Sequence, residues 1–253
     1  MPACSGRRRE LALADPGVQR RTRARKEQKG SMATPITFNK ISKNNEILTI
    51  LKELDRQLGI VGYTEHGVRH AKWVGRTAQK VLKELGRDPR EAELAGIAGF
   101  LHDLGNLVNR EDHAQAGALL AHDILRDLEM PLSEIIQVMS AIGNHDEMHS
   151  HPATNVAAAL VLADKADVHR SRVRNPSTVK FDIHDRVNYA VQKSVLEVLP
   201  EKNIIRLNLT VNTKISQVME YFEIFLSRMV VSRRAAEFLG SHYELAVNGN
   251  QLL

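Results

Sequence analysis

The stretch from Asp88 to Leu101 constrains the fold more than any other part of this sequence, because it is apolar on nearly every side. Proline is favoured in the first turn of a helix, so Asp88-Pro89 marks a helix start. The apolar residues that follow are Ala92, Leu94, Ala95, Ile97, Ala98, Phe100 and Leu101. A helix with this pattern is stable only when other elements surround it. The stretch therefore predicts a mainly α fold around a buried helix, with Gly96 and Gly99 at close helix contacts.

Apolar residues at helical spacing predict further helices on both sides of this stretch. The expected ranges are 47–58, 64–86, 112–128, 132–143, 153–170 and 184–198. Thr64 is the expected N-cap of the second range, and Gly59 and Gly86 are the expected ends of the first two. Proline residues separate several of these ranges, which is typical of short connections between packed helices.

After Pro200 the apolar period changes from helical to alternating. The pattern predicts a strand over 205–211, a helix over 215–230 and a short strand over 243–247. Two strands alone make a poor sheet, so this strand–helix–strand appendage must pack on the helical region or on a second subunit. We predict a helical domain over 39–199 and a small α/β unit over 200–253, with a homodimer through strand edges as one option.

The basic character of the chain is confined to its first residues. The formal net charge is +5, but residues 1–30 hold nine of the 35 Lys and Arg residues and only three of the 30 Asp and Glu residues. Residues 1–31 are expected to be a disordered basic leader, with translation expected to start at Met32. A basic arm of this kind could bind nucleic acid, but the folded part offers no comparable charge. Nucleic acid is therefore not the expected partner.

Composition also excludes several classes of protein. No apolar run approaches the roughly 20 residues that span a bilayer, so no membrane partner is expected. No apolar stretch follows the N-terminal arginines, which argues against a secretion signal. Cys4 is the single cysteine, so an internal disulfide framework is excluded. We expect a cytoplasmic protein.

Histidines and carboxylates stand at the ends of otherwise apolar helices. The pair His102-Asp103 closes the apolar stretch, in the string AGIAGFLHDLGN. Burying such a pair without partners costs about 1–3 kcal/mol for each group, and a metal ion would satisfy both side chains. A helix cap or a hydrogen bond in the core is the alternative for a lone His-Asp pair. Comparable residues occur in the neighbouring predicted helices, namely His66, His113, His145 and Asp164.

The order of these residues resembles the HD superfamily of metal-dependent phosphohydrolases, over roughly residues 47–172. The local strings EHxxRHAxxV, FLHDLGN, HAQAG and LADKADVHR are also similar to it. The resemblance implies an HD-type helical bundle with one or two divalent ions, for which Fe, Mn, Zn and Ni are the candidates. It also implies a ligand set: His66, His102, Asp103 and Asp164 for one ion, and His113 and His145 for a second ion that Asp103 bridges.

The resemblance implies that metal-activated water attacks a phosphate ester of a small molecule, with nucleotides and dinucleoside polyphosphates as candidates. Asp103 and Lys165 are the expected catalytic residues, and Lys165, Arg170 and His70 the expected substrate-binding ones. For His70, filling the core is an equal alternative. Arg172 and Arg174 are expected on a solvated face. The string HDLGN lacks the lysine of the HD-x-G-K pattern, and no Gly-Tyr-Pro signature is present, which disfavours the cyclic-di-GMP hydrolases.

Two other functions remain open from the sequence. The chain could be a non-catalytic regulatory module that binds metal or nucleotide in the same pocket without turnover. It could also act on nucleic acid through residues 7–29. Hydrolysis of a phosphoester distinguishes the first alternative, and truncation to Met32 distinguishes the second.

Overall fold

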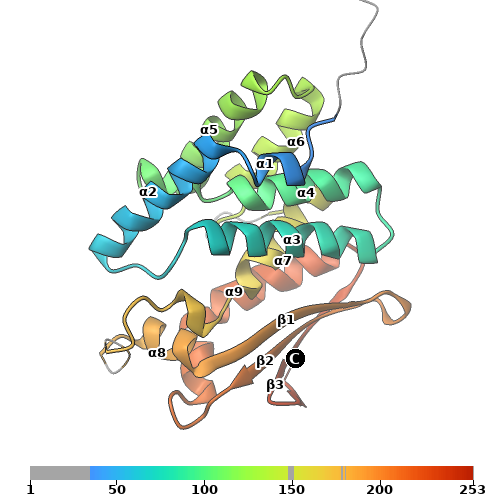
Figure 1. The fold of residues 1–253 in the computed structure, drawn as a ribbon. Coiled ribbons are helices and arrows are strands. Elements are labelled where there is room, and N and C mark those ends of the chain that lie inside the picture. Colours follow the sequence, from blue (N-terminus) through green and yellow to red (C-terminus); the bar gives the residue numbers. More distant parts are fainter. Residues whose placement is uncertain (1–34, 148–150, 178, 180, 253) are drawn as a thin grey trace, which may run out of the picture. The chain divides into compact units, whose positions relative to one another are not determined.

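The computed structural model describes residues 35–147, 151–177, 179 and 181–252 (Figure 1). The leader expected over 1–31 and the expected start at Met32 lie outside these residues. The helical part contains α1 (Phe38–Ile41), α2 (Asn45–Val61), α3 (Val68–Glu84), α4 (Pro89–Leu101), η1 (Leu104–Leu107), α5 (His113–Asp127), α6 (Leu132–Gly143), α7 (Asn155–Ala166) and η2 (Arg170–Arg172). The mainly α fold is confirmed.

Helix α4 lies at the centre of the helical part. It packs against α3, α6 and α7, and every residue from Leu94 to Leu101 is buried. Its start follows the sequence, because the Asp88 side chain accepts hydrogen bonds from the first turn and Pro89 occupies the first helical position. A Cβ atom added at Gly99 would lie 2.8 Å from the Cα of Gly75 in α3. The predicted close helix contact is thus confirmed, and it brings α3 and α4 together above the site described below.

The predicted boundaries of α2 and α3 are wrong by a few residues. Gly62, with φ of +99°, ends α2 in place of Gly59, because a left-handed residue is required there. Helix α3 starts at Val68 with Gly67 as its N-cap and no side-chain cap, so Thr64 does not cap it. The side chain of Glu65 instead accepts a hydrogen bond from the Gly67 amide at 2.8 Å.

The helix predicted over 184–198 is wrong beyond Ala190. Helix α8 (Ile183–Ala190) is followed directly by strand β1 (Val191–Leu199). Val191, Val195 and Val198 have helical spacing, but β-branched residues also favour strands. The antiparallel partner β2 (Ile204–Val211) decides the outcome, in a register that runs from Val191 opposite Val211 to Leu199 opposite Ile204. The turn between them contains η3 (Pro200–Lys202).

The sheet has the order β1-β2-β3-β4. Strand β3 (His242–Val247) runs parallel to β2, and β4 (Asn250–Gln251) pairs antiparallel with β3. Helix α9 (Val218–Phe238) is the crossover between β2 and β3, so the predicted strand–helix–strand order is confirmed. Strand β1 supplies the pairing that two strands would lack. Among the residues described, no helix has the length and apolarity needed to cross a membrane.

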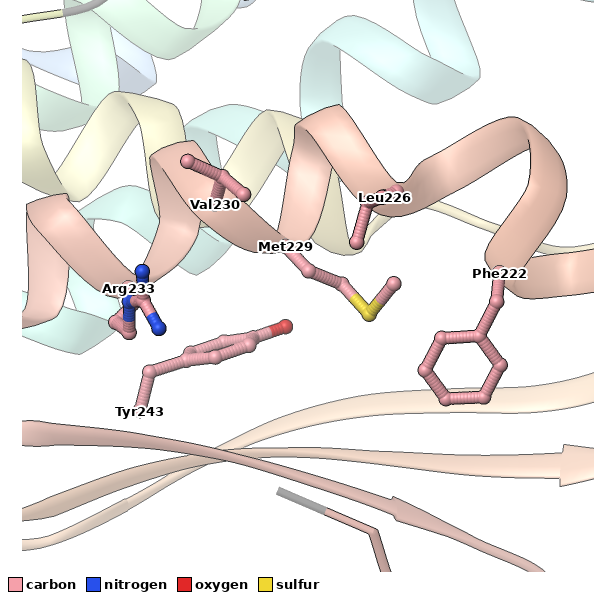
Figure 2. A pocket seen from close by; sticks show the side chains of 6 residues that line it. All are labelled: Phe222, Leu226, Met229, Val230, Arg233 and Tyr243. Carbon is pink, nitrogen blue, oxygen red and sulfur yellow. The ribbon is translucent and has the colours of Figure 1, made fainter.

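Helix α9 joins the sheet to the helical part. One side of it faces the sheet, where Met229 and Tyr243 approach each other around an apolar cavity of about 140 Å³ (Figure 2). Another side packs against α7. Since α7 carries Asp164, the contact brings α9 close to the polar cluster of the helical part. The described residues from Pro35 onward form a single compact unit.

Candidate metal centre

Seven polar side chains from six segments of the helical part meet at one buried place. They are His66, His70, His102, Asp103, His113, His145 and Asp164. None is more than 9% exposed. Neighbouring ring centroids in the series His66, His70, His102, His145 and His113 lie between 4.9 and 5.7 Å apart. The segments that carry them are distant in sequence, so the fold itself assembles the cluster.

All five imidazole rings are oriented by a hydrogen bond at Nδ1. Four Nδ1 atoms donate to the backbone carbonyls of Thr64, Gly99, Arg110 and Ile142, at 2.7, 2.9, 2.9 and 2.6 Å. His70 Nδ1 donates to Asp167 Oδ2 at 2.6 Å. These oxygens can only accept, so Nδ1 carries a proton, and each ring presents a lone pair at Nε2 whenever it is neutral. Metal-binding histidines are held in this way by partners behind the ring.

The lone pairs of Nε2 face one another across the cluster. His70 Nε2 lies 3.3 Å from His102 Nε2, and His113 Nε2 lies 3.3 Å from His145 Nε2. Two lone pairs at this distance repel each other unless a proton or a metal ion lies between them. A proton or a metal ion between the two nitrogens would remove this repulsion, so the cluster is suited to hold a cation.

Two groups of donor atoms are compact enough to hold an ion, with all atoms of a group within 4.8 Å of one another. The first donor set is His70, His102 and Asp164, and the second donor set is His102, Asp103 and His145. His113 adjoins the second set, with Nε2 3.8 Å from Asp103 Oδ1. Mixed imidazole and carboxylate donors suit divalent transition metals.

Asp103 also favours a cation at this place, and its Oδ2 lies 3.3 Å from His102 Nε2. Its Oδ2 is buried and has no hydrogen-bond partner within the part of the chain that the structure describes. Its other oxygen, Oδ1, accepts a hydrogen bond from Asn106 Nδ2 at 2.8 Å. An orphaned buried carboxylate oxygen is costly unless a cation neutralises it. Asn106 thus orients Asp103.

The pKa shifts in the cluster indicate that its carboxylates stabilise a positive charge beside them. Burial opposes charge on His102, but the adjacent Asp103 carboxylate outweighs it and raises the pKa of His102 to about 10. Burial would raise the pKa of Asp103, yet His102 holds that pKa well below its usual range. By contrast, burial lowers the pKa of His145 well below the usual value, so this imidazole is neutral. A proton on His102 therefore neutralises the carboxylates where a metal ion would otherwise do so.

Basic side chains surround the open side of the cluster. The basic side chains are those of Arg110, Lys165, Arg172 and Arg228. Together with His66, Asp103, His113 and Asp164, they line a cavity of about 40 Å³. Lys165 Nζ donates to Asp164 Oδ2 at 2.7 Å. The lining also includes Asp146 and Glu147, so basic side chains and carboxylates lie side by side next to the donor atoms.

The structure places some expected site residues differently. His70, not His66, belongs to the first donor set, whereas His66 lines the cavity. Arg172, expected on a solvated face, is buried and donates from Nε to the Glu65 carbonyl at 3.1 Å. Arg170 stacks on the Tyr189 ring, 4.9 Å from its centroid, and does not lie among the residues that line the cavity.

A sequence signal for His70 was present. His70 lies four residues before Val74 and so shares the apolar face of α3, whereas His66 precedes the helix. Arg174 donates to Asp55 Oδ1 at 2.5 Å, at the surface as expected. Arg228 had no sequence signal, because α9 lies outside the resemblance.

Two glycines allow the His102-Asp103 turn to approach α5. A Cβ atom at Gly105 would lie 1.9 Å from the His113 carbonyl oxygen, and one at Gly117 would lie 2.9 Å from the His102 carbonyl oxygen. Any larger residue at Gly105 would push His113 away from Asp103. This contact explains the spacing of His113 and Gly117 in the string HAQAG.

Three comparisons place the chain among known proteins. The HD domain family model matches residues 67–169. The uncharacterized protein MJ1020 of Methanocaldococcus jannaschii is 29% identical over 207 residues, which are 72% of this chain and 80% of that protein. Ribonuclease Y of Opitutus terrae is 30% identical over 136 residues, which are 54% of this chain but 24% of that protein. A predicted HD superfamily hydrolase from an uncultured Thermotogales bacterium aligns in its crystal structure with a TM-score of 0.39 and 25% identity, over 49% of this chain and 67% of that one.

Proposed function

We propose that this chain, which carries an HD-superfamily domain over residues 67–169, is a divalent-metal-dependent phosphohydrolase that acts on a small phosphorylated molecule. The observation that carries the proposal is the set of convergent Nε2 lone pairs around Asp103. HD domains bind divalent metals, and these donors have the protonation and spacing that a metal requires. The basic residues of the cavity add the charge that a phosphate ester needs.

For the ligands, we propose that His70, His102 and Asp164 hold one ion and that His145 and His113 complete a second. Asp103 belongs to the second set, and its Oδ2 lies 3.5 Å from His70 Nε2 of the first, so this carboxylate would help to hold both ions. His66 then becomes a residue of the cavity wall and no longer a ligand. Its Nδ1 donates to the Thr64 carbonyl, which leaves Nε2 free to accept a hydrogen bond from a bound water or substrate.

Divalent ions at these positions would lower the pKa of a bound water and polarise a phosphoryl oxygen. The protein's own residues position the substrate and balance charge. Lys165 lies beside Asp164, and Arg172 is fixed by carbonyl oxygens on both sides, at 3.1 Å from Glu65 and 3.2 Å from Asp167. We propose that Lys165 and Arg172 neutralise phosphoryl oxygens, because phosphoryl transfer depends mainly on positioning and charge neutralisation.

We propose nucleotides and dinucleoside polyphosphates as the first substrates to examine, because Arg110, Lys165, Arg172 and Arg228 line the cavity beside the donor atoms. RNA enters the panel because Ribonuclease Y of Opitutus terrae is similar over 136 residues. A regulatory module that binds metal or nucleotide without turnover is the alternative. We also propose a cytoplasmic location, which the single cysteine favours. We propose a homodimer through the C-terminal strands, because strand edges can pair with a second copy.

The test is metal analysis of anaerobically purified protein, followed by a phosphoester panel that includes mononucleotides, dinucleoside polyphosphates and an RNA oligonucleotide. We expect Asp103→Ala to lose bound metal and at least about a thousandfold in rate, since it removes the bridging ligand. Asp127→Ala, at a side chain that is 77% exposed on α5, is the matched control. Metal-replete protein that binds nucleotides but hydrolyses nothing on the panel would favour the regulatory module.

A further inference from the structure

The carboxylate of Glu147, which follows α6, accepts two hydrogen bonds from α9 and forms an ion pair with Lys165 of α7. Its Oε1 accepts from Arg228 Nε at 3.0 Å and lies 3.7 Å from Lys165 Nζ. Its Oε2 accepts from Ser227 Oγ at 2.6 Å. One carboxylate thus contacts a guanidinium, an ammonium and a hydroxyl.

The three donors form the kind of group that recognises an oxyanion. Guanidinium and ammonium groups bind phosphate oxygens through charge-assisted hydrogen bonds, and a hydroxyl adds a neutral donor. Lys165 also contacts Asp164 of the first donor set, so the group adjoins the metal centre. Arg228 lines the same cavity as Asp103 and Arg172.

The donors keep their positions through contacts other than Glu147. The guanidinium of Arg228 stacks on the Phe225 ring, 4.4 Å from its centroid. Lys165 is held by Asp164, within buried α7. The side chains of Arg228 and Glu147 remain 26% and 24% exposed. Solvent thus reaches Arg228, whereas the Lys165 side chain is only 7% exposed, so an incoming anion would meet Arg228 first.

We propose that Lys165, Arg228 and Ser227 form an oxyanion subsite for a phosphate of the substrate, and that Glu147 occupies this subsite until the phosphate displaces it. The role in substrate binding rests on the proposed function. Helix α9 lies outside the HD domain, so the subsite would give the C-terminal unit a direct part in recognition. Glu147 and the phosphate compete for the same donors. Removing the Glu147 charge should therefore strengthen phosphate binding, whereas removing a donor should weaken it.

The experiment measures binding of inorganic phosphate to the metal-loaded full chain by titration calorimetry. Glu147→Gln keeps the shape of the side chain but removes the competing charge, so we expect phosphate to bind several-fold tighter. Arg228→Met removes a charged donor, so we expect phosphate to bind about tenfold to a hundredfold weaker. Arg234→Met, at an exposed position of the same helix, should leave the affinity unchanged.

If the contact between Glu147 and Arg228 only stabilises the fold, the two substitutions should not have opposite effects on phosphate binding. If Glu147→Gln and Arg228→Met both weaken phosphate binding, or if neither changes it, the subsite does not exist. Thermal unfolding of each variant shows whether it is folded. Should Arg228→Met fail to fold, Arg228→Lys keeps the charge but loses the planar fork, and it should weaken phosphate binding by a smaller factor.

Turnover separates this inference from the proposed function. If a hydrolysed phosphoester is found, Arg228→Met should raise KM more than it lowers kcat, whereas a ligand substitution abolishes turnover. If the chain hydrolyses nothing but the opposite effects on phosphate binding hold, the subsite stands and the phosphohydrolase fails. If hydrolysis is found but neither Glu147→Gln nor Arg228→Met changes the phosphate affinity, the proposed subsite is wrong and the phosphohydrolase proposal stands.

Discussion

The two donor sets share His102, but different kinds of partner hold them in place. In the first set, His70 is held by the side chain of Asp167, which also accepts from Arg69 at 2.7 Å. In the second set, the Nδ1 of His145 donates to the carbonyl of Ile142 in α6. A carboxylate behind an imidazole makes the ring a better metal ligand than a carbonyl does. The first set should therefore bind its ion more tightly. The orientation of His70 depends on a side chain, whereas the orientation of His145 depends on the backbone.

The largest expected effect comes from breaking the first set at His70. We expect His70→Ala to lose one ion per chain and most of the hydrolytic activity. His66→Ala should keep the metal content, because His66 lies outside both donor sets. The measurement is metal content per chain by elemental analysis, with the two variants as mutual controls. Loss of metal in His66→Ala with full metal in His70→Ala would reverse the ligand assignment.

A smaller effect is expected at the partner behind His70. Asp167→Asn keeps the size of the side chain but weakens its hold on His70 Nδ1, so metal affinity should fall by about 10–100-fold. Competition with a chromophoric chelator measures this change. Asp127→Asn, on the exposed side of α5, should change nothing. If Asp167→Asn weakened both ions equally, the contrast between the two sets would not hold.

Sequence alone specified most of the helical part, because buried positions there must be apolar unless a polar group has a partner. The string ending in His102-Asp103 shows this most clearly: the residues before it predict burial, and burial predicts a cation. The resemblance to the HD superfamily, and not burial, grouped His113, His145 and Asp164 with this pair. It assigned His66 as a ligand and His70 to substrate binding, whereas the start of α3 at Val68 leaves only His70 within the helix.

The C-terminal part was less predictable, because long-range pairing decided its structure. Residues 191–199 fit a helix and a strand equally well by spacing, and β2 selected the strand. Arg228 illustrates the same limit for the site. Its position in α9 carries no local signal, and only the packing of α9 against α7 brings it to Lys165 and Glu147.

The dependence of metal binding on pH gives the smallest and finest test of the contrast. The pKa of His102 is raised to about 10, so without metal this imidazole is protonated throughout the neutral range. The first ion to bind must displace that proton, and its affinity should rise by about tenfold per pH unit between roughly pH 6 and 8. The second ion then meets His145, whose pKa is lowered by burial and which carries no Nε2 proton to displace. Its affinity should change much less over the same range. Calorimetric titrations at several pH values, in buffers of different ionisation enthalpy, count the protons released by each ion. Equal proton release for both ions would show that the two sets are not distinguished by the charge on His102.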